Sequence, residues 1–460
     1  MSHRIHVHTP IVYDPDIVAR ALDEPALPVD VSDRVLAPFI TIDGRINVTT
    51  SNFLRHHTLG TPNLATARRL ASDLAGWLDH LCNTCALNSH LVGSDPVLEA
   101  TEEHFASYYR RRQYGTNGEL LSSEGWGRAA SAIKRLYEYL QRRLHHPPPF
   151  AIVSFSHPQG GRGTTIARYR PRRRNTGSAG TPLTPAFAEH LLAGALRVDL
   201  DGAQDAYKGA ERDHAVISLG FAAGLRRNNL ANVTTYEIPP VGSLPITTMR
   251  VADHITKGDA GGDALVFSHR LQAVHHYITG SRAEIAERST YRPDDPLRVV
   301  DADSARVRYA DSDGEISTQR WANLDGATRR RLVSPDGASP VLFLNEYTGH
   351  PLAYSSFQHV VAKAASFVRE RIDGTFPDAL RLHDLRHTYA VHLTAAIYRG
   401  VIADAVEPHR RDDWLVDHIA AAVELVKFSL GHASEASTRL YIQTAHRFVG
   451  IPVDQFLGDH

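Results

Sequence analysis

The sequence contains little cysteine, no long apolar segment and almost no net charge. Two cysteines among 460 residues exclude a disulfide-rich secreted scaffold and indicate a reducing compartment. No run of about 18 apolar residues occurs, so no transmembrane helix is expected. The first residues also lack the apolar stretch of a secretory signal. We therefore expect a cytoplasmic protein with no membrane partner.

The net charge of −1 gives no indication of a nucleic-acid partner, because many nucleic-acid-binding proteins are basic overall. The hydrophobic content of 42% and the charged content of 22% are typical of a globular protein. A chain of this length is too long for one ordinary hydrophobic core, so two or three domains are expected. Binding to nucleic acid would require positive charge to gather locally.

The first third of the chain predicts a small helical domain behind an N-terminal extension. Residues 1–60 form the extension, with a short hairpin around the Asp43-Gly44 turn. Residues 61–150 show apolar residues at helical spacing, and the run Pro147-Pro148-Pro149 ends the second helical pattern. The apolar positions that define the two helix faces are Leu70, Leu74, Trp77, Leu78 and Leu81, then Ile133, Leu136, Tyr137, Leu140 and Leu144.

Residues 151–182 carry the local positive charge that the overall composition hides. The segment holds six arginines and no acidic residue, and its glycines and serines predict a flexible linker. Arginines on such a strap can follow a phosphate backbone, although a solvated tether without a partner is the alternative. The candidate DNA-binding residues are Arg168, Arg170, Arg172, Arg173 and Arg174.

Three short motifs near the C-terminus carry the chemistry. The first runs from His383 through Arg386, the second is Leu430-Gly431-His432, and the third ends in Tyr441. Arginine offers a permanently charged fork of donors that matches a phosphate. Histidine exchanges protons near neutral pH, and tyrosine supplies an oxygen that can form a covalent link. Together these residue types indicate attack on a phosphodiester.

The three motifs resemble the C-terminal signature of the tyrosine recombinases, the phage-integrase family, which carries His-x-x-Arg, Leu-Gly-His and Thr-x-x-Tyr in this order. The resemblance implies a first catalytic arginine after a Gly-Leu pair, which matches Arg226, with Arg227 as the alternative. It also implies a lysine on a β-hairpin, which matches Lys257 in the loop between residues 248–251 and 264–267. The family usually carries an acidic residue three positions after the arginine. Asn229 stands there, so a neutral hydrogen bond is expected to replace a salt bridge.

The resemblance implies the architecture as well. We expect a mainly α protein with a small antiparallel β-sheet, made of a helical core-binding domain over 61–150 and an α+β catalytic domain over 183–460. Two insertions are predicted in the catalytic domain, near 281–340 and 397–426. The first is charged and irregular, contains the run Arg329-Arg330-Arg331, and is a candidate DNA-facing segment as a whole.

The function implied is that of a site-specific recombinase or integrase, an enzyme of DNA integration and DNA recombination in a mobile element. Two arginines would bind the phosphate, Tyr441 would attack it, and the product would be a 3′-phosphotyrosine intermediate without a cofactor. The implied partners are double-stranded DNA, a homo-tetramer on paired sites and accessory DNA-bending proteins. The catalytic residues implied are Arg226, Lys257, His383, Arg386, His432 and Tyr441.

Other functions stay open at this point. A type IB-like topoisomerase would share the chemistry, and a silent DNA-binding relative would share the fold. His383 and His387 stand four apart, as zinc ligands do on a helix, so a metal hydrolase is also considered. Cys82 and Cys85 form a Cys-x-x-Cys pair, but a zinc site there would need two further ligands, and no second cysteine pair exists.

Overall fold

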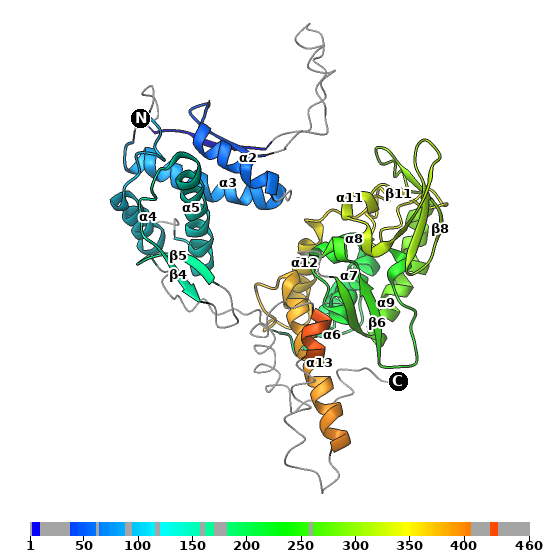
Figure 1. The fold of residues 1–460 in the computed structure, drawn as a ribbon. Coiled ribbons are helices and arrows are strands. Elements are labelled where there is room, and N and C mark those ends of the chain that lie inside the picture. The colour runs from blue at the N-terminus through cyan, green and yellow to red at the C-terminus, as the bar shows by residue number, and fades with distance from the viewer. Residues whose placement is uncertain are drawn as a thin grey trace. The chain divides into compact units, whose positions relative to one another are not determined.

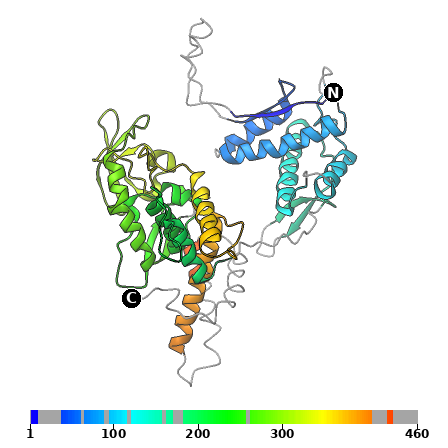
Figure 2. The same ribbon diagram turned by 180° about the vertical axis from the view of Figure 1, so that it is seen from behind.

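The computed structural model describes residues 2–9, 37–60, 64–87, 94–115, 120–156, 162–169, 182–256, 261–405 and 424–430. The chain divides into two compact units, Met1–Gly177 and Ser178–His460. Figure 1 shows them from one side and Figure 2 from behind. Among the described helices, none is both long enough and apolar enough to cross a membrane.

The first unit combines helices with two small antiparallel sheets. Its helices are α2 (Val48–Gly60), α3 (Leu64–Asp79), the π-helical turn η2 (His80–Thr84), α4 (Glu102–Tyr114) and α5 (Ser123–Leu144). The strands β1 (Ile5–His8), β2 (Phe39–Ile42) and β3 (Arg45–Ile46) form one sheet, and β4 (Ile152–Ser156) pairs with β5 (Arg162–Ile166). The predicted turn at Asp43-Gly44 joins β2 to β3, and both residues have positive φ.

The core of this unit confirms the two predicted helix faces. Trp77 on α3 and Tyr137 on α5 are fully buried, together with the neighbouring apolar positions on each face, whereas Leu144 at the end of α5 is exposed. The α5 N-terminus is capped by Ser122, whose side chain accepts a hydrogen bond from the Gly125 N–H. These helices therefore owe their packing to the spacing of their apolar residues.

Two segments outside the predicted helical domain also contribute to this core. Ile40, Ile42 and Phe53, from the segment predicted as an extension, are buried in it. Ile166 of β5, in the predicted linker, is buried there too, and the Trp126 indole N–H donates to the Tyr169 carbonyl at 2.9 Å. Strands this short carry too little periodicity to be assigned to a core from sequence.

The second unit is built around α7 (Ala210–Ala223), which is buried along most of its length. Helices α6, α9 and α13 pack against it. The helical elements of the unit are α6 (Pro185–Leu196), α8 (Arg227–Asn232), η3 (Thr235–Glu237), η4 (Asp253–Ile255), α9 (Ser268–Thr279), α10 (Ser281–Glu287), η5 (Trp321–Asn323), α11 (Gly326–Arg329), α12 (Ser356–Arg371) and α13 (Leu382–Ala405). Residues 424–430 are also helical.

Two sheets complete the second unit (Figure 1). The predicted hairpin is present as β6 (Ile246–Val251) paired with β7 (Gly262–Phe267). A four-stranded sheet of order β10-β9-β8-β11 is made from β8 (Leu297–Ala302), β9 (Arg306–Ala310), β10 (Ile316–Arg320) and β11 (Leu332–Val333). Only the β8–β11 pairing among these described strands is parallel. The described residues thus form a mainly α protein with small, largely antiparallel sheets, as predicted.

The four-stranded sheet corrects the expectation of an irregular segment over 281–340. Leu297, Val299 and Val307 on the inner face of the sheet pack with Trp321 and Leu332 in a separate small core. Buried and exposed residues alternate in β8 and β9, but each strand is short and is followed by a turn that contains acidic residues. High charge therefore hid a strand pattern rather than marking an irregular loop.

Candidate functional site

The two predicted catalytic arginines meet at one small cavity in the second unit. Arg226 and Arg386 both line it, although 160 residues separate them in the chain. The cavity has a volume of about 30 Å³, enough for a water molecule or for the oxygen of a bound group. Its remaining walls come from the end of α7, the β6–β7 hairpin and residues 428–430.

Arg226 is placed by the turn between α7 and α8. Gly224 ends α7 in the left-handed conformation (φ 58°), and a Cβ there would collide with the ring of Tyr389. Arg226 is then extended as the N-cap of α8, and its backbone N–H donates to the Asn229 side-chain oxygen at 3.1 Å. The predicted position at the start of a helix is confirmed.

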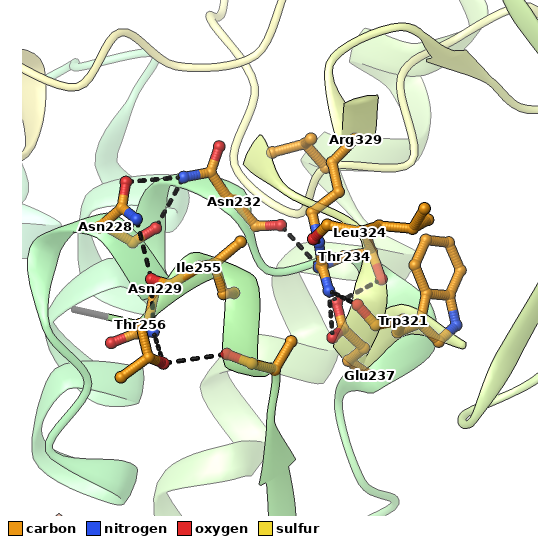
Figure 3. Close-up of polar contacts among 12 residues, drawn as sticks. Asn228, Asn229, Asn232, Thr234, Glu237, Ile255, Thr256, Trp321, Leu324 and Arg329 are labelled. Carbon is orange, nitrogen blue, oxygen red and sulfur yellow. Dashed lines mark hydrogen bonds and ion pairs between the residues drawn. The ribbon is translucent and has the colours of Figure 1, made fainter. Parts of the chain in front are cut away.

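Asn229 joins this turn to the hairpin. Its side-chain N–H groups donate to the Ile255 carbonyl at 3.0 Å and to the Thr256 hydroxyl oxygen at 2.9 Å (Figure 3). The side chain is buried, so each hydrogen bond lies in a site where an unpaired polar group would be costly. The predicted neutral hydrogen bonds are therefore present where the family usually has a salt bridge.

Arg386 connects three elements around the cavity. It lies on the first turns of α13 and is only 5% exposed. One terminal nitrogen donates to the Gly224 carbonyl at 2.6 Å, and the other donates to the Leu430 carbonyl. Leu430 is the first residue of the second motif, so Arg386 ties the turn before Arg226 to that motif.

His383 and His387 lie one turn apart on α13, with ring centroids 4.5 Å apart. Burial lowers the pKa of His383, and the charges of Arg386 and Arg226 act in the same direction. Burial and the neighbouring His383 lower the pKa of His387 to about 4. Both imidazoles are therefore neutral at pH 7 and can accept a proton or a hydrogen bond. Among the described residues, no third histidine, cysteine or carboxylate joins them in a group suited to a metal ion.

Tyr389 occupies the core, as its apolar helix face predicted. Its hydroxyl donates to the Leu265 carbonyl at 2.6 Å and lies 2.6 Å from the Ser429 hydroxyl. Burial raises the pKa of this phenol well above its usual range. The phenol is buried and its hydroxyl makes two hydrogen bonds, so Tyr389 cannot reach a DNA phosphate. It links β7 to residues 424–430 instead.

Several predicted site residues lie outside the described part of the chain: Lys257, His432, Tyr441, Arg170, Arg172, Arg173 and Arg174. Thr256 and Gly261, which flank the loop containing Lys257, both line the cavity. Arg168 is described and exposed in the first unit, with a left-handed backbone (φ 68°) just after β5. Contact of these arginines with DNA stays a prediction.

A buried arginine, Arg329, holds the end of α8, the helix that Arg226 caps. Arg329 is fully buried and donates to both carboxylate oxygens of Glu237 at 2.5 and 3.0 Å (Figure 3). It also donates to the Asn232 carbonyl at 3.0 Å, at the end of α8, and to the Trp321 and Leu324 carbonyls. We call this group, Arg329, Glu237, Trp321, Leu324 and Asn232, the Arg329 cluster.

The run Arg329-Arg330-Arg331, inside the insertion predicted to face DNA, has partners within the protein. Arg330 donates to the Ala231 carbonyl at 3.0 Å, and Arg331 pairs with Asp295. Sequence reasoning missed these roles because Glu237 lies 92 residues from Arg329 and no local pattern links them. It also missed Asn228 and Asn232, which extend the hydrogen bonds along α8 to the Ile255 carbonyl.

No family model matches the sequence, and no curated protein is significantly similar to it. Solved structures do resemble it. One is the XerH site-specific recombinase bound to a palindromic difH substrate in a post-cleavage complex, with 14% identity and a TM-score of 0.46 over 87% of this chain and 82% of that chain. This recombinase and the two integrases below are tyrosine recombinases.

Two further examples are integrases bound to DNA. The Tn1549 transposon integrase in complex with circular intermediate DNA has 12% identity and a TM-score of 0.44, over 85% of this chain and 94% of that chain. A lambda integrase dimer bound to a COC′ core site has 11% identity and a TM-score of 0.43, over 85% and 94%. At 11–14% identity, the likeness to these three structures is one of fold.

Proposed function

We propose that this chain is a site-specific DNA recombinase or integrase that cleaves and rejoins DNA strands through a 3′-phosphotyrosine intermediate. The observation that carries the proposal is the convergence of Arg226 and Arg386 on one cavity, with the neutral His383 beside them on α13. A phosphodiester repels nucleophiles because it is negatively charged. Two guanidinium groups would offset that charge and the further charge that grows in the transition state.

The reaction assigns one step to each remaining residue. The Tyr441 oxygen attacks phosphorus, the bond to the bridging 5′-oxygen breaks, and the tyrosine becomes linked to the 3′-phosphate. His383 accepts the phenolic proton or orients the phosphate, and His432 donates a hydrogen bond to a non-bridging oxygen. Lys257 gives a proton to the departing 5′-oxygen. A 5′-hydroxyl from another strand reverses these steps, so the energy of the phosphodiester is kept and no ATP is needed.

The buried hydrogen bonds suit a site that must be rigid. Asn229 fixes the N-cap that presents Arg226, and the carbonyls of Gly224 and Leu430 orient the Arg386 guanidinium. Groups held in place before the substrate binds do not have to reorganise during the reaction. In this proposal the protein acts in the cytoplasm on the DNA of a mobile element, as a homo-tetramer on paired double-stranded sites, with accessory DNA-bending proteins as further candidate partners.

Covalent trapping tests the proposal directly. The full chain is incubated with nicked duplexes taken from the DNA that flanks its gene, so that the short leaving strand diffuses away after cleavage. We expect a denaturant-resistant protein–DNA adduct that Tyr441→Phe abolishes while duplex binding is kept, because the change removes a single oxygen. Tyr347→Phe is the matched control, since Tyr347 is 80% exposed and away from the cavity.

The outcomes separate the proposed reaction from its alternatives. An adduct that persists in the Tyr441→Phe variant would remove this residue as the nucleophile. An adduct with relaxation of supercoiled DNA, but without exchange between paired sites, would indicate a topoisomerase. Loss of strand cleavage on adding a chelator would favour a metal hydrolase at His383 and His387.

A further inference from the structure

The outer face of the four-stranded sheet carries a row of arginines. Arg306 and Arg308 are two residues apart on β9, so they project from the same face. Arg320 on β10 is the cross-strand partner of Arg306. Arg298 on β8 pairs with Ala310, two positions beyond Arg308, and therefore joins the same face. We call these four exposed residues the arginine face.

The charge on this face is offset only in part within the sheet. In the described part of the chain, none of the four guanidinium groups forms a hydrogen bond or an ion pair within 4 Å. Arg306 and Arg320 stand directly opposite each other, an arrangement that destabilises a sheet. Asp301, the cross-strand partner of Arg308, is the one acidic residue in β8, β9 and β10.

The acidic residues at the ends of these strands have other roles. The Asp303 carboxylate accepts hydrogen bonds from the backbone N–H groups of Ala305 and Arg306, both at 2.7 Å. The Asp311 carboxylate accepts from the N–H groups of Asp313 and Glu315, at 3.0 and 2.9 Å. These carboxylates shape the two turns. The N–H groups of Ala305 and Arg306 lower the pKa of Asp303 and the charge of Arg306 adds to this, so Asp303 offsets part of the charge at the start of β9.

The sheet is firmly attached to the candidate site. Trp321, which follows β10, packs under the sheet, and its carbonyl accepts a hydrogen bond from the buried Arg329. Arg329 in turn binds the Asn232 carbonyl at the end of α8, the helix that Arg226 caps. A surface held in this way keeps a fixed position relative to the cavity, which suits a partner that must reach both.

We propose that the arginine face binds the phosphate backbone of double-stranded DNA outside the cleaved position, an inference that rests on the proposed function. Arginines two apart on a strand lie roughly 7 Å from each other, within reach of neighbouring phosphates along a DNA strand. Guanidinium groups bind phosphate oxygens through paired donors. Such contacts give affinity without reading the base sequence.

The test compares two triple variants of the full chain that carry the same change in charge. The first is Arg306→Gln, Arg308→Gln and Arg320→Gln. The control is Lys208→Gln, Lys363→Gln and Arg371→Gln, three exposed cations elsewhere on the second unit. The dissociation constant for a long duplex is measured over a range of salt concentrations. We expect the first variant to lower the slope of log affinity against log salt by about one per arginine. We expect no such change in the control.

The possible results for the two variants separate the inference from its alternatives. An unchanged slope in the first variant would overturn the inference and leave an acidic protein surface as the partner of the arginine face. Equal losses in both variants would also overturn it, because net charge alone would then explain them. Adduct formation by the unaltered chain is scored separately on the nicked duplexes from the DNA that flanks its gene. Its absence would contradict the proposed recombinase reaction, whatever the salt slopes show.

Discussion

Arginines on the two sides of one small sheet have opposite surroundings. Beneath the sheet, Arg329 is fully buried and gives its donors to Glu237 and to three backbone carbonyls. On the outer side, Arg306, Arg308 and Arg320 are exposed, and Arg306 faces another arginine across the strands. The same residue type therefore stabilises the fold on one side and weakens it on the other.

The contrast shows that a run of arginines cannot be assigned from its charge alone. Arg329-Arg330-Arg331 is the densest basic run in the second unit, yet its members bind Glu237, backbone carbonyls and Asp295. The arginine face has no such run, because strand alternation spaces its members two apart. A guanidinium whose donors are all used inside the protein is structural, whereas one without an internal partner is available to an anion.

The largest effect is expected from breaking the Arg329 cluster. Arg329→Met would leave the Glu237 carboxylate buried with only the Thr234 N–H and hydroxyl as donors, at 2.9 and 2.8 Å. Removing one partner of a buried ion pair costs about 3 kcal/mol or more. We expect a fall of that size in the free energy of unfolding of the second unit, measured by urea denaturation.

A second substitution provides the control for this prediction. Glu237→Gln added to Arg329→Met removes the unpaired charge and should recover part of the lost stability. A loss below about 1 kcal/mol in the single variant would instead mean that Glu237 becomes protonated or hydrated at little cost. In that case the Arg329 cluster would not be the anchor of the sheet.

A pH-dependent effect of intermediate size is expected where the second unit begins. The buried His392 donates to the Leu183 carbonyl at 2.9 Å, and the Leu183 N–H donates to the Thr388 hydroxyl at 3.0 Å. Burial lowers the pKa of His392 to about 4; the charge of Arg270 adds to this, whereas the Leu183 bond and Glu189 oppose it. These two hydrogen bonds fix the start of the second unit to α13.

The sign of the pH effect follows from that lowered pKa. The folded state keeps His392 neutral down to about pH 4, while the unfolded chain binds a proton below the ordinary pKa of 6.5. The contribution of His392 to the free energy of unfolding is therefore fully present above pH 6.5 and is lost as the pH falls toward 4. We expect it to account for about 2 kcal/mol of the loss between pH 7 and pH 5. His392→Gln should reduce the pH dependence by that amount, and an unchanged pH profile would contradict the assignment.

Sequence patterns could predict the features that depend on local spacing. The apolar faces of α3, α5 and α13, the β6–β7 hairpin and the N-cap position of Arg226 all follow from residues a few positions apart. The neutral replacement at Asn229 could be predicted because its position relative to Arg226 is fixed by one helical turn.

Features that depend on distant pairing could not be predicted in this way. Glu237 and Arg329 meet across 92 residues, and Leu183 meets His392 across 209. The sheet over 297–333 was missed because β8, β9 and β10 are short and their turns are acidic. Its arginine face emerges only when the strand register is known, since Arg306 and Arg320 become neighbours through pairing and not through sequence.

The smallest effect on stability comes from the arginine face, and it should have the opposite sign to the effect at Arg329. Arg320→Glu replaces a like-charged cross-strand pair with an oppositely charged one opposite Arg306. Such exchanges are worth roughly 0.2–1 kcal/mol, and salt screens them at an exposed site. We expect thermal denaturation at low salt to show a slightly more stable protein, while its affinity for duplex DNA falls. Arg320→Gln should lie between the two, because it removes repulsion without adding attraction.

The double variant Arg306→Glu with Arg320→Glu restores a like-charged pair and should lose the gain in stability while binding DNA more weakly still. If the double variant kept the gain, the stabilisation would come from the overall charge of the face and not from this pair. Stability and DNA affinity that fell together in Arg320→Glu would place Arg320 with Arg329 as a structural arginine, and the distinction between the two sides of the sheet would fail.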